Sequence, residues 1–207
     1  SRGKSTFVNA LLGAKILPMD ILPTTAVLTR VFYGEQPKII LHYYDGTIKE
    51  IEVEELKECI TCLNDSASRE SAKIACADIY YPSAICRNSC AIVDTPGVND
   101  INNQNTDITY GFIPQSDAVI MLLDPNQPFS LSEKTFLKDK ILNQDITKIF
   151  FVMNKSDLIK PENKQSVMDY TKSKLMELDN ISADCVKMYT VSSKKTLISK
   201  IRNRPDS

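Results

Sequence analysis

The feature that most constrains this chain is the order of three short polar segments along it. The first is Gly3-Lys4-Ser5-Thr6, the second is Asp94-Thr95-Pro96-Gly97, and the third is Asn154-Lys155-Ser156-Asp157. Each segment alone occurs by chance in many chains. Because each one follows an expected strand or begins an expected helix, the three together predict an α/β domain that binds a nucleotide.

The apolar and turn patterns predict a P-loop NTPase G domain, with a mixed, mostly parallel sheet and helices on both faces. Asp45-Gly46 lies between two alternating segments and predicts a hairpin. The strands at 77–81 and 91–94 are expected to be antiparallel or at an edge. Expected strands are residues 27–33, 38–44, 47–53, 77–81, 91–94, 119–123, 148–153 and 188–191; expected helices are 6–12, 54–74 with an interruption near 64–66, 130–143 and 161–178.

Composition narrows the class of partner. Lysine and arginine number 25 against 26 aspartates and glutamates, which gives no electrostatic argument for nucleic acid as a partner. The longest apolar runs, residues 118–123 and 149–153, are too short to span a bilayer. Of the six cysteines, Cys59-x-x-Cys62 has half of a zinc spacing, but the single His42 and the lack of a second close pair do not complete a set of four ligands. Cys59 and Cys62 are therefore expected to be small, reduced apolar residues of one helix. His42 is expected to lie on a strand face.

The sequence starts partway through the phosphate-binding motif. A complete loop reads G-x-x-x-x-G-K-[ST] after a strand, and Gly3 occupies the position of the second glycine. We therefore expect residues 1–207 to be a G domain that is incomplete at both ends, with its first strand and first loop glycine upstream of Ser1.

The residues Gly3, Lys4, Ser5 and Thr6 form the predicted phosphate-binding segment. The Lys4 ammonium would bind the β- and γ-phosphates, and the Ser5 hydroxyl would bind Mg²⁺. The helix that begins here would direct its N-terminal N–H groups at the β-phosphate.

The second segment would sense the terminal phosphate. Asp94 would reach Mg²⁺ through a water molecule, and Gly97 would donate its backbone N–H to the γ-phosphate, where a side chain would obstruct it. Thr25 is the candidate for the second Mg²⁺ hydroxyl and the movable switch, and Thr24 is its alternative. The predicted metal ligands are thus Ser5, Thr25 and Asp94.

The third segment would recognise the base. The Asp157 carboxylate can accept hydrogen bonds from guanine N1–H and N2–H₂ together, whereas adenine offers no such donors. Leaving that carboxylate unpaired would cost about 1–3 kcal/mol or more. Asn154 would brace the loop, Lys155 would cover the ring with its stem, and Ser193 and Lys194 would complete the pocket through their backbone.

Hydrolysis needs a group that organises the attacking water or the transition state. Small GTPases often place a glutamine after the glycine of the second segment, but here Val98 occupies that position. Arg2 is a candidate arginine finger in cis, and the alternative is a solvated loop arginine. The predicted catalytic residues are Lys4, Thr25, Gly97 and Arg2.

Six segments of the chain carry a family resemblance, namely residues 3–13, 16–18, 23–29, 91–100, 117–119 and 149–157. In these segments the chain resembles the dynamin superfamily, specifically the bacterial dynamin-like and mitofusin-like GTPases. The interval of 69 residues from Thr25 to Asp94 (94 − 25) also resembles that family.

That resemblance implies a GTPase that dimerises through its nucleotide face, with a helical stalk and a membrane-binding tip that remodel or tether bilayers. The first strand, the stalk and the tip are not recognisable in residues 1–207. Membrane contact would then fall to other parts of a cytoplasmic protein, peripheral at the inner face of the cell membrane. Ser1 matches the loop serine that the family uses near an activating monovalent cation, and Thr25 matches the switch threonine.

Two alternatives stay open. A truncated G domain could have weak or no affinity for GTP and GDP and act through protein contacts alone. A ribosome-assembly GTPase would also carry the three segments, but its usual basic RNA-binding appendage is not seen and the net charge is −1.

Overall fold

The computed structural model describes residues 2–19, 27–60, 73–95, 111–143, 148–178, 181 and 186–203. The chain divides into two compact units. The first holds residues 1, 3–109 and 197–207, and the second holds residue 2 and residues 110–196. The expectation of one domain that is incomplete at both ends stays a prediction.

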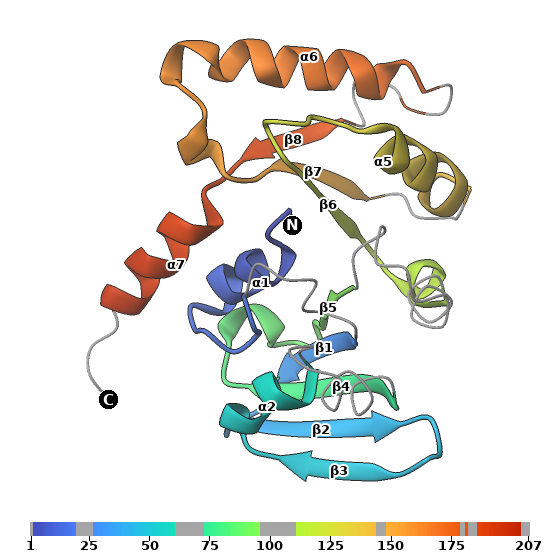
Figure 1. The fold of residues 1–207 in the computed structure, drawn as a ribbon, viewed down its shortest axis with the longest axis vertical. Coiled ribbons are helices and arrows are strands. Elements are labelled where there is room, and N and C mark those ends of the chain that lie inside the picture. Colours follow the sequence, from blue (N-terminus) through green and yellow to red (C-terminus); the bar gives the residue numbers. More distant parts are fainter. Residues whose placement is uncertain are drawn as a thin grey trace. The chain divides into compact units, whose positions relative to one another are not determined.

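The first unit contains a mixed five-stranded sheet with the order β3-β2-β4-β1-β5 (Figure 1). β1 is parallel to β4 and antiparallel to β5, while β2 is antiparallel to both β3 and β4. The hairpin predicted at Asp45-Gly46 is therefore confirmed. The strands are β1 Leu28–Tyr33, β2 Lys38–Tyr43, β3 Ile48–Ile51, β4 Ile74–Tyr81 and β5 Ile92–Asp94.

The sequence-based expectation for this sheet is confirmed in one respect and wrong in another. β4 is antiparallel to β2, and β5 is antiparallel to β1 at the edge of the sheet, with β1 between β4 and β5. Ile74 was expected to end a helix but begins β4 opposite Tyr43, where it is 1% exposed. Burial against the core and pairing with β2 decide its conformation, and local propensity cannot anticipate either.

One face of this sheet is apolar and carries the core of the first unit. This core also includes residues from helix α1 (Lys4–Leu12), helix α2 (Val53–Ile60) and the short turn η1 (Ala84–Cys86). α1 ends, as predicted, at Gly13, whose φ of 71° is left-handed and whose N–H donates to the Asn9 carbonyl. The core consists mainly of Val8, Leu12, Leu17, Val31, Ile39, Leu41, Leu56, Ile74, Ala77 and Ile79.

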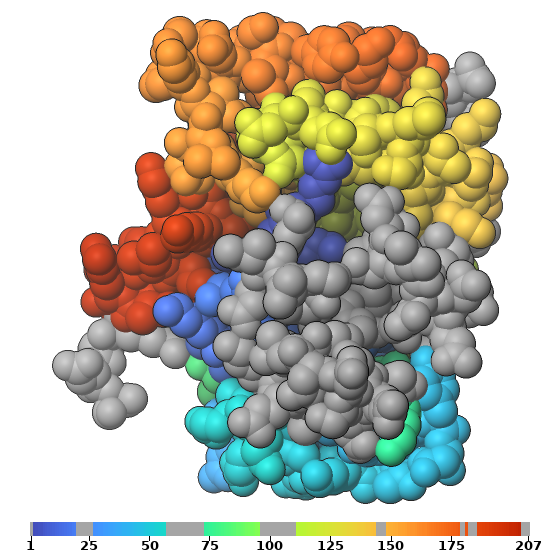
Figure 2. Space-filling model, in the orientation of Figure 1, coloured from blue at the N-terminus to red at the C-terminus, as the bar shows by residue number. Residues whose placement is uncertain are grey.

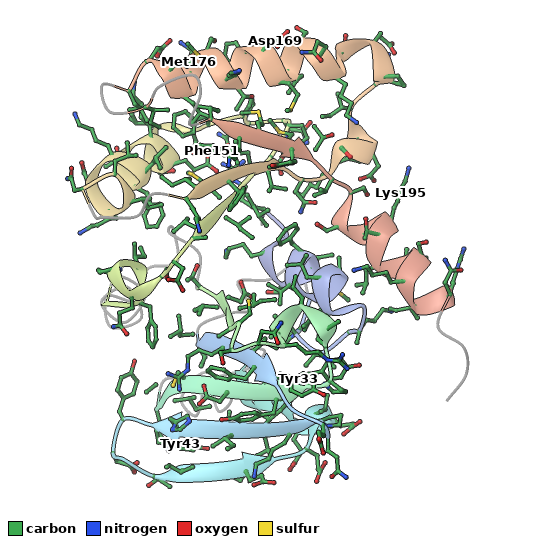
Figure 3. The ribbon with its side chains drawn as sticks, turned by 180° about the vertical axis from the view of Figure 1, so that it is seen from behind. Tyr33, Tyr43, Phe151, Asp169, Met176 and Lys195 are labelled. Carbon is green, nitrogen blue, oxygen red and sulfur yellow. The ribbon has the colours of Figure 1, made fainter. Side chains whose placement is uncertain are left out.

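The second unit contains a parallel three-stranded sheet in the order β6-β7-β8, formed by Val119–Leu123, Ile149–Met153 and Lys187–Thr190. Helix α6 (Lys164–Met176) covers it, with Thr171 and Leu175 buried (Figure 1). Asp169 and Met176 project from α6 away from the strands (Figure 3), and α6 forms an outer surface of the unit (Figure 2). The core consists of Ile113, Met121, Leu123, Phe129, Leu137, Ile141, Phe151, Met153, Leu175, Leu178 and Val186.

The connection between β6 and β7 is helical. Ser130 caps α5 (Leu131–Phe136) and shares a capping box with Glu133, as the sequence predicts. The helix continues as the π-helical segment η3 (Leu137–Ile141). Shorter helical turns are η2 Ile113–Gln115, η4 Ser156–Leu158 and η5 Pro161–Asn163.

Helix α7 (Ser193–Arg202) was not among the expected elements. Its residues from Leu197 onward belong to the first unit, where the Lys200 ammonium donates to the Leu11 carbonyl at 3.3 Å. Among the described residues, every helix is too short or too polar to cross a bilayer.

Candidate phosphate-binding and base-binding sites

The N-terminus of α1 has the geometry of an anion-binding turn. Gly3 precedes the helix with φ 81° and ψ 36°, a left-handed conformation that glycine adopts without steric cost. The first bond along the helix runs from the Phe7 N–H to the Gly3 carbonyl at 2.9 Å. The amides of the first turn, at Lys4, Ser5 and Thr6, therefore lie at the positive end of the helix dipole.

Asp94 lies beside this turn within the first unit. It is the last residue of β5, and its carboxylate accepts a hydrogen bond from the Ser5 hydroxyl with 2.8 Å between the oxygens. A hydroxyl and a carboxylate are the hard oxygen ligands that Mg²⁺ prefers. The structure thus brings together two of the three predicted metal ligands, and Thr25 lies outside the described residues.

The electrostatics of Asp94 favour a nearby cation. The side chain is 2% exposed, and this burial raises the pKa of the carboxyl, while the Lys4 ammonium and the Ser5 hydroxyl act against that effect. A buried carboxylate whose charge is only partly compensated gains stability from a divalent ion. Ser5 and Asp94 therefore fit the Mg²⁺ that the sequence predicts here.

Asn9 organises the chain that follows α1. It is fully buried, and its amide donates to the Leu17 carbonyl at 2.7 Å while its side-chain oxygen accepts from the N–H groups of Ile16 and Leu17. These bonds fix the start of the segment that leads toward Thr25. Sequence reasoning assigned Asn9 no role, although a polar residue on the buried side of a short helix was a usable signal.

In the second unit, Asn154 connects several segments of the predicted base-binding region. It follows β7 and is 2% exposed. Its amide donates to the Arg2 carbonyl at 3.0 Å, and its side-chain oxygen accepts from the Ser193 N–H at 3.1 Å and the Ser193 hydroxyl at 2.7 Å. Asn154 thus links the backbone of Arg2 to Ser193, and its role in bracing a base-binding loop stays a prediction.

Asp157 lies in η4, is solvent-exposed, and is accessible to a ligand. A hydrogen bond from the Ser192 side chain is the main effect that lowers the pKa of its carboxyl, and the positive charges of Lys195 and Lys194 add to it. Lys195 projects from the first turn of α7 (Figure 3). Asp157 is therefore an ionised acceptor at neutral pH, as bidentate recognition of guanine requires.

Lys155 has a partner that the sequence did not suggest. Its ammonium lies 2.6 Å from Asp124 Oδ2, just after β6. Desolvation raises the pKa of the Asp124 carboxyl, but the hydrogen bonds from Lys155 and the Asn126 N–H and the charges of Lys155 and Arg2 together lower it. Lys155 also has φ 54°, a left-handed conformation that costs about 1–2 kcal/mol in a residue with a Cβ.

The Arg2 guanidinium is engaged within the second unit. Its Nε lies 3.0 Å from Glu133 Oε1, and its two other nitrogens donate to the Gln127 carbonyl and the Ser130 hydroxyl at 3.2 and 3.4 Å. Arg2 is therefore not the solvated loop arginine that the alternative interpretation expects. A role as an arginine finger stays a prediction, and it would require the guanidinium to leave Glu133.

The described residues place the predicted site residues in two sets. The phosphate set is Gly3, Lys4, Ser5, Thr6 and Asp94, and the base set is Asn154, Lys155, Asp157, Ser193 and Lys194. Ser1, Thr24, Thr25, Gly97 and Val98 lie outside the described residues, as does Cys62.

The partners that sequence reasoning missed are Asn9, Asp124, Glu133 and Ser192. Asp124 follows an expected parallel strand, and Ser192 follows another, which are positions where ligand-binding residues collect in α/β sheets. Glu133 was identified only as a helix-capping residue.

Comparison with known proteins identifies relatives over most of the chain. The family model described as the Dynamin family matches residues 1–156. An uncharacterised protein from the xynA 3′ region of Caldicellulosiruptor sp. (strain Rt8B.4) is 34% identical over 200 residues, and the bacterial dynamin-like protein of Nostoc punctiforme is 31% identical over 167 residues. These alignments cover 97% and 77% of this chain.

A solved structure shares the fold. A chain from an oligomerised bacterial dynamin pair, described as sensing and tethering membranes, superposes with a TM-score of 0.73 at 24% identity over 96% of this chain. The chain spans only part of its relatives: 48% of the Caldicellulosiruptor protein, 24% of the Nostoc protein and 33% of the solved chain.

Proposed function

The chain belongs to the dynamin family, and from that premise we propose that it binds guanine nucleotides with Mg²⁺ and hydrolyses GTP. The observation that carries the proposal is the Ser5–Asp94 pair at the N-terminus of α1, where a buried carboxylate meets a hydroxyl at 2.8 Å beside Lys4. Lys4, the helix N-terminus and a bound cation would together neutralise a polyphosphate.

In this proposal, Lys4 and the Gly3–Thr6 backbone hold the β- and γ-phosphates. Ser5 and Thr25 would hold Mg²⁺, Asp94 would hold it through water, and the ion would neutralise charge that develops on the phosphates. The Gly97 N–H would contact the γ-phosphate. An arginine-finger role for Arg2 would require its release from Glu133, and we expect the ion pair to keep Arg2 in a structural role instead.

Asp157 would select the base. Its ionised carboxylate accepts from guanine N1–H and N2–H₂, and the Ser192 hydroxyl keeps its pKa low. Because the Lys155 ammonium is bound to Asp124, its stem is the part of the side chain left to cover the ring. Ser193 and Lys194 would line the base through their backbone, and Ser193 is fixed there by Asn154.

The wider role follows from the relatives. We propose that the protein dimerises through its nucleotide face, with Ser1 near an activating monovalent cation. Parts of the protein outside residues 1–207 would contact a membrane for remodelling or tethering, from the cytoplasm at the inner face of the cell membrane. The bacterial dynamin pair described as tethering membranes supports this proposal.

Titration with fluorescent GDP at millimolar Mg²⁺ tests nucleotide binding. Lys4→Ala should abolish saturable binding, whereas the matched variant Lys15→Ala, at an exposed lysine beyond α1, should bind like the unmodified chain. Equal affinity in Lys4→Ala would refute the proposal. Absence of binding in the unmodified chain would favour an interaction module that does not use nucleotide.

A further inference from the structure

A second group of reactive side chains lies on the polar face of the first unit's sheet. His42 on β2 is directly opposite Cys76 on β4, and Asp78 lies two residues further along β4, so all three project from the same face. One donor atom from each of them lies within 4.8 Å of the other two. The imidazole Nε2 is 2.9 Å from Asp78 Oδ2.

This group is separate from the phosphate set. Asp94 is the register partner of Thr29, whereas Asp78 is the register partner of Arg30, the next residue along β1. Because neighbouring residues of a strand point to opposite faces, Asp94 and Asp78 lie on opposite faces of the sheet. The group therefore needs an explanation other than phosphate binding.

The chemistry of the donors selects a class of ligand. A thiol, an imidazole and a carboxylate are the ligands that zinc and similar divalent transition ions take, whereas Mg²⁺ takes oxygen alone. All three residues project from paired strands, which hold donors more precisely than loops do. We propose that His42, Cys76 and Asp78 bind one zinc-type divalent ion, with the fourth coordination position open to water.

Solvent reaches the proposed metal site past the His42 side chain. The His42 side chain is 31% exposed and Cys76 is half-buried, whereas the Asp78 side chain is only 8% exposed. The hairpin that carries β2 and β3 lies at the surface of the unit (Figure 2). An ion can thus reach the thiol and the imidazole without opening the sheet.

Arg30 is the group that limits the affinity. Its Nε and one terminal nitrogen donate to the two Asp78 oxygens at 2.5 and 2.7 Å. This bidentate contact orients the carboxylate as an outer-shell partner does, but its positive charge also repels a cation. The site should therefore bind zinc more weakly than closed sites with four cysteine and histidine ligands.

Metal binding at this site exchanges a proton and changes no oxidation state. The metal binds the thiolate form of Cys76, so the S–H bond breaks as the bond from Sγ to the metal forms, and the proton passes to water. His42 contributes the lone pair of a neutral ring nitrogen.

Cobalt(II) titration of the nucleotide-free chain tests the proposal, because a thiolate ligand gives Co²⁺ a charge-transfer absorption band. The band should appear in the unmodified chain, disappear in Cys76→Ser, and require about tenfold or more Co²⁺ in His42→Gln. Zn²⁺ should displace the cobalt and abolish the band.

Two control variants separate this site from the other cysteines. Cys90→Ser removes an exposed cysteine, and the double variant Cys59→Ser/Cys62→Ser removes the C-x-x-C pair; both should keep the band. Absence of the band in the unmodified chain, or its persistence in Cys76→Ser, would overturn the proposal. Its loss in the double variant alone would assign the metal to Cys59 and Cys62 and also overturn it.

Circular dichroism keeps the result interpretable if a variant is unstable. Cys76→Ala offers a second thiol-free variant, and Zn²⁺ should raise the Tm of the unmodified chain but not of either Cys76 variant. An equal rise in Tm in a folded Cys76 variant would contradict the assignment.

Discussion

Replacing Arg2 with alanine should destabilise the second unit, because it leaves the Glu133 carboxylate without its cation. The side chains of Arg2 and Glu133 are 23% and 6% exposed, and their nitrogen and oxygen atoms are 3.0 Å apart. Exposed pairs contribute about 0–1 kcal/mol, whereas loss of one partner from a buried pair costs about 3–5 kcal/mol. With one partner buried and the other partly exposed, we expect a loss of about 1–3 kcal/mol in the free energy of unfolding.

Urea unfolding followed by circular dichroism measures this loss, with Arg202→Ala, at an exposed arginine of α7, as the matched control. A double-mutant cycle with Glu133→Gln isolates the interaction, since Gln keeps the shape and one acceptor of the capping residue. A coupling energy below about 0.5 kcal/mol in this cycle would refute the importance of the pair.

The same variant tests the catalytic role of Arg2. An arginine finger is worth about 10³–10⁵ in kcat, whereas a residue that only holds α5 and the start of the phosphate loop should change kcat far less. We expect Arg2→Ala to lower stability and leave GTP hydrolysis within about tenfold of the unmodified rate, because Glu133 holds the guanidinium. A loss of about a thousandfold in a folded variant would instead support the finger.

Three further changes probe the two residue sets. Asp94→Asn should weaken Mg²⁺-dependent GDP binding but raise the Tm of the nucleotide-free chain at neutral pH, because burial raises the pKa of Asp94 and so disfavours its charged form. This increase in Tm over the unmodified chain should vanish at acid pH, where Asp94 is itself protonated. Asn154→Ala should cost about 2–4 kcal/mol in urea unfolding, since Ser193 loses its acceptor. Ser192→Ala should raise the pKa of Asp157, so GDP binding in pH titrations should fail at a higher pH than in the unmodified chain.

Local signals explain what the sequence predicted well. The capping box at Ser130 and Glu133, the Asp45-Gly46 turn and the end of α1 at Gly13 each depend on a few neighbouring residues. The strands β6 and β7 form continuous apolar runs, so their bounds were predicted to within one residue.

Long-range pairing explains what the sequence did not predict. Nothing local indicates that β1 separates β4 from β5, or that His42 lies opposite Cys76, because the register of distant strands is set by the sheet as a whole. Arg2 pairs with Glu133, more than a hundred positions away, and Lys155 pairs with Asp124, about thirty positions away. Only the fold brings the members of each pair into contact.

The most direct test of guanine recognition is to exchange the carboxylate of Asp157 for an amide. Asp157→Asn removes the acceptor for guanine N2–H₂ but supplies an N–H donor that suits the C2 carbonyl of xanthine. Parallel titrations should show that the unmodified chain prefers GDP over XDP and ADP, and that Asp157→Asn prefers XDP by about tenfold or more. If both proteins bind the three nucleotides alike, Asp157 does not read the base and the assignment of a guanine site is wrong.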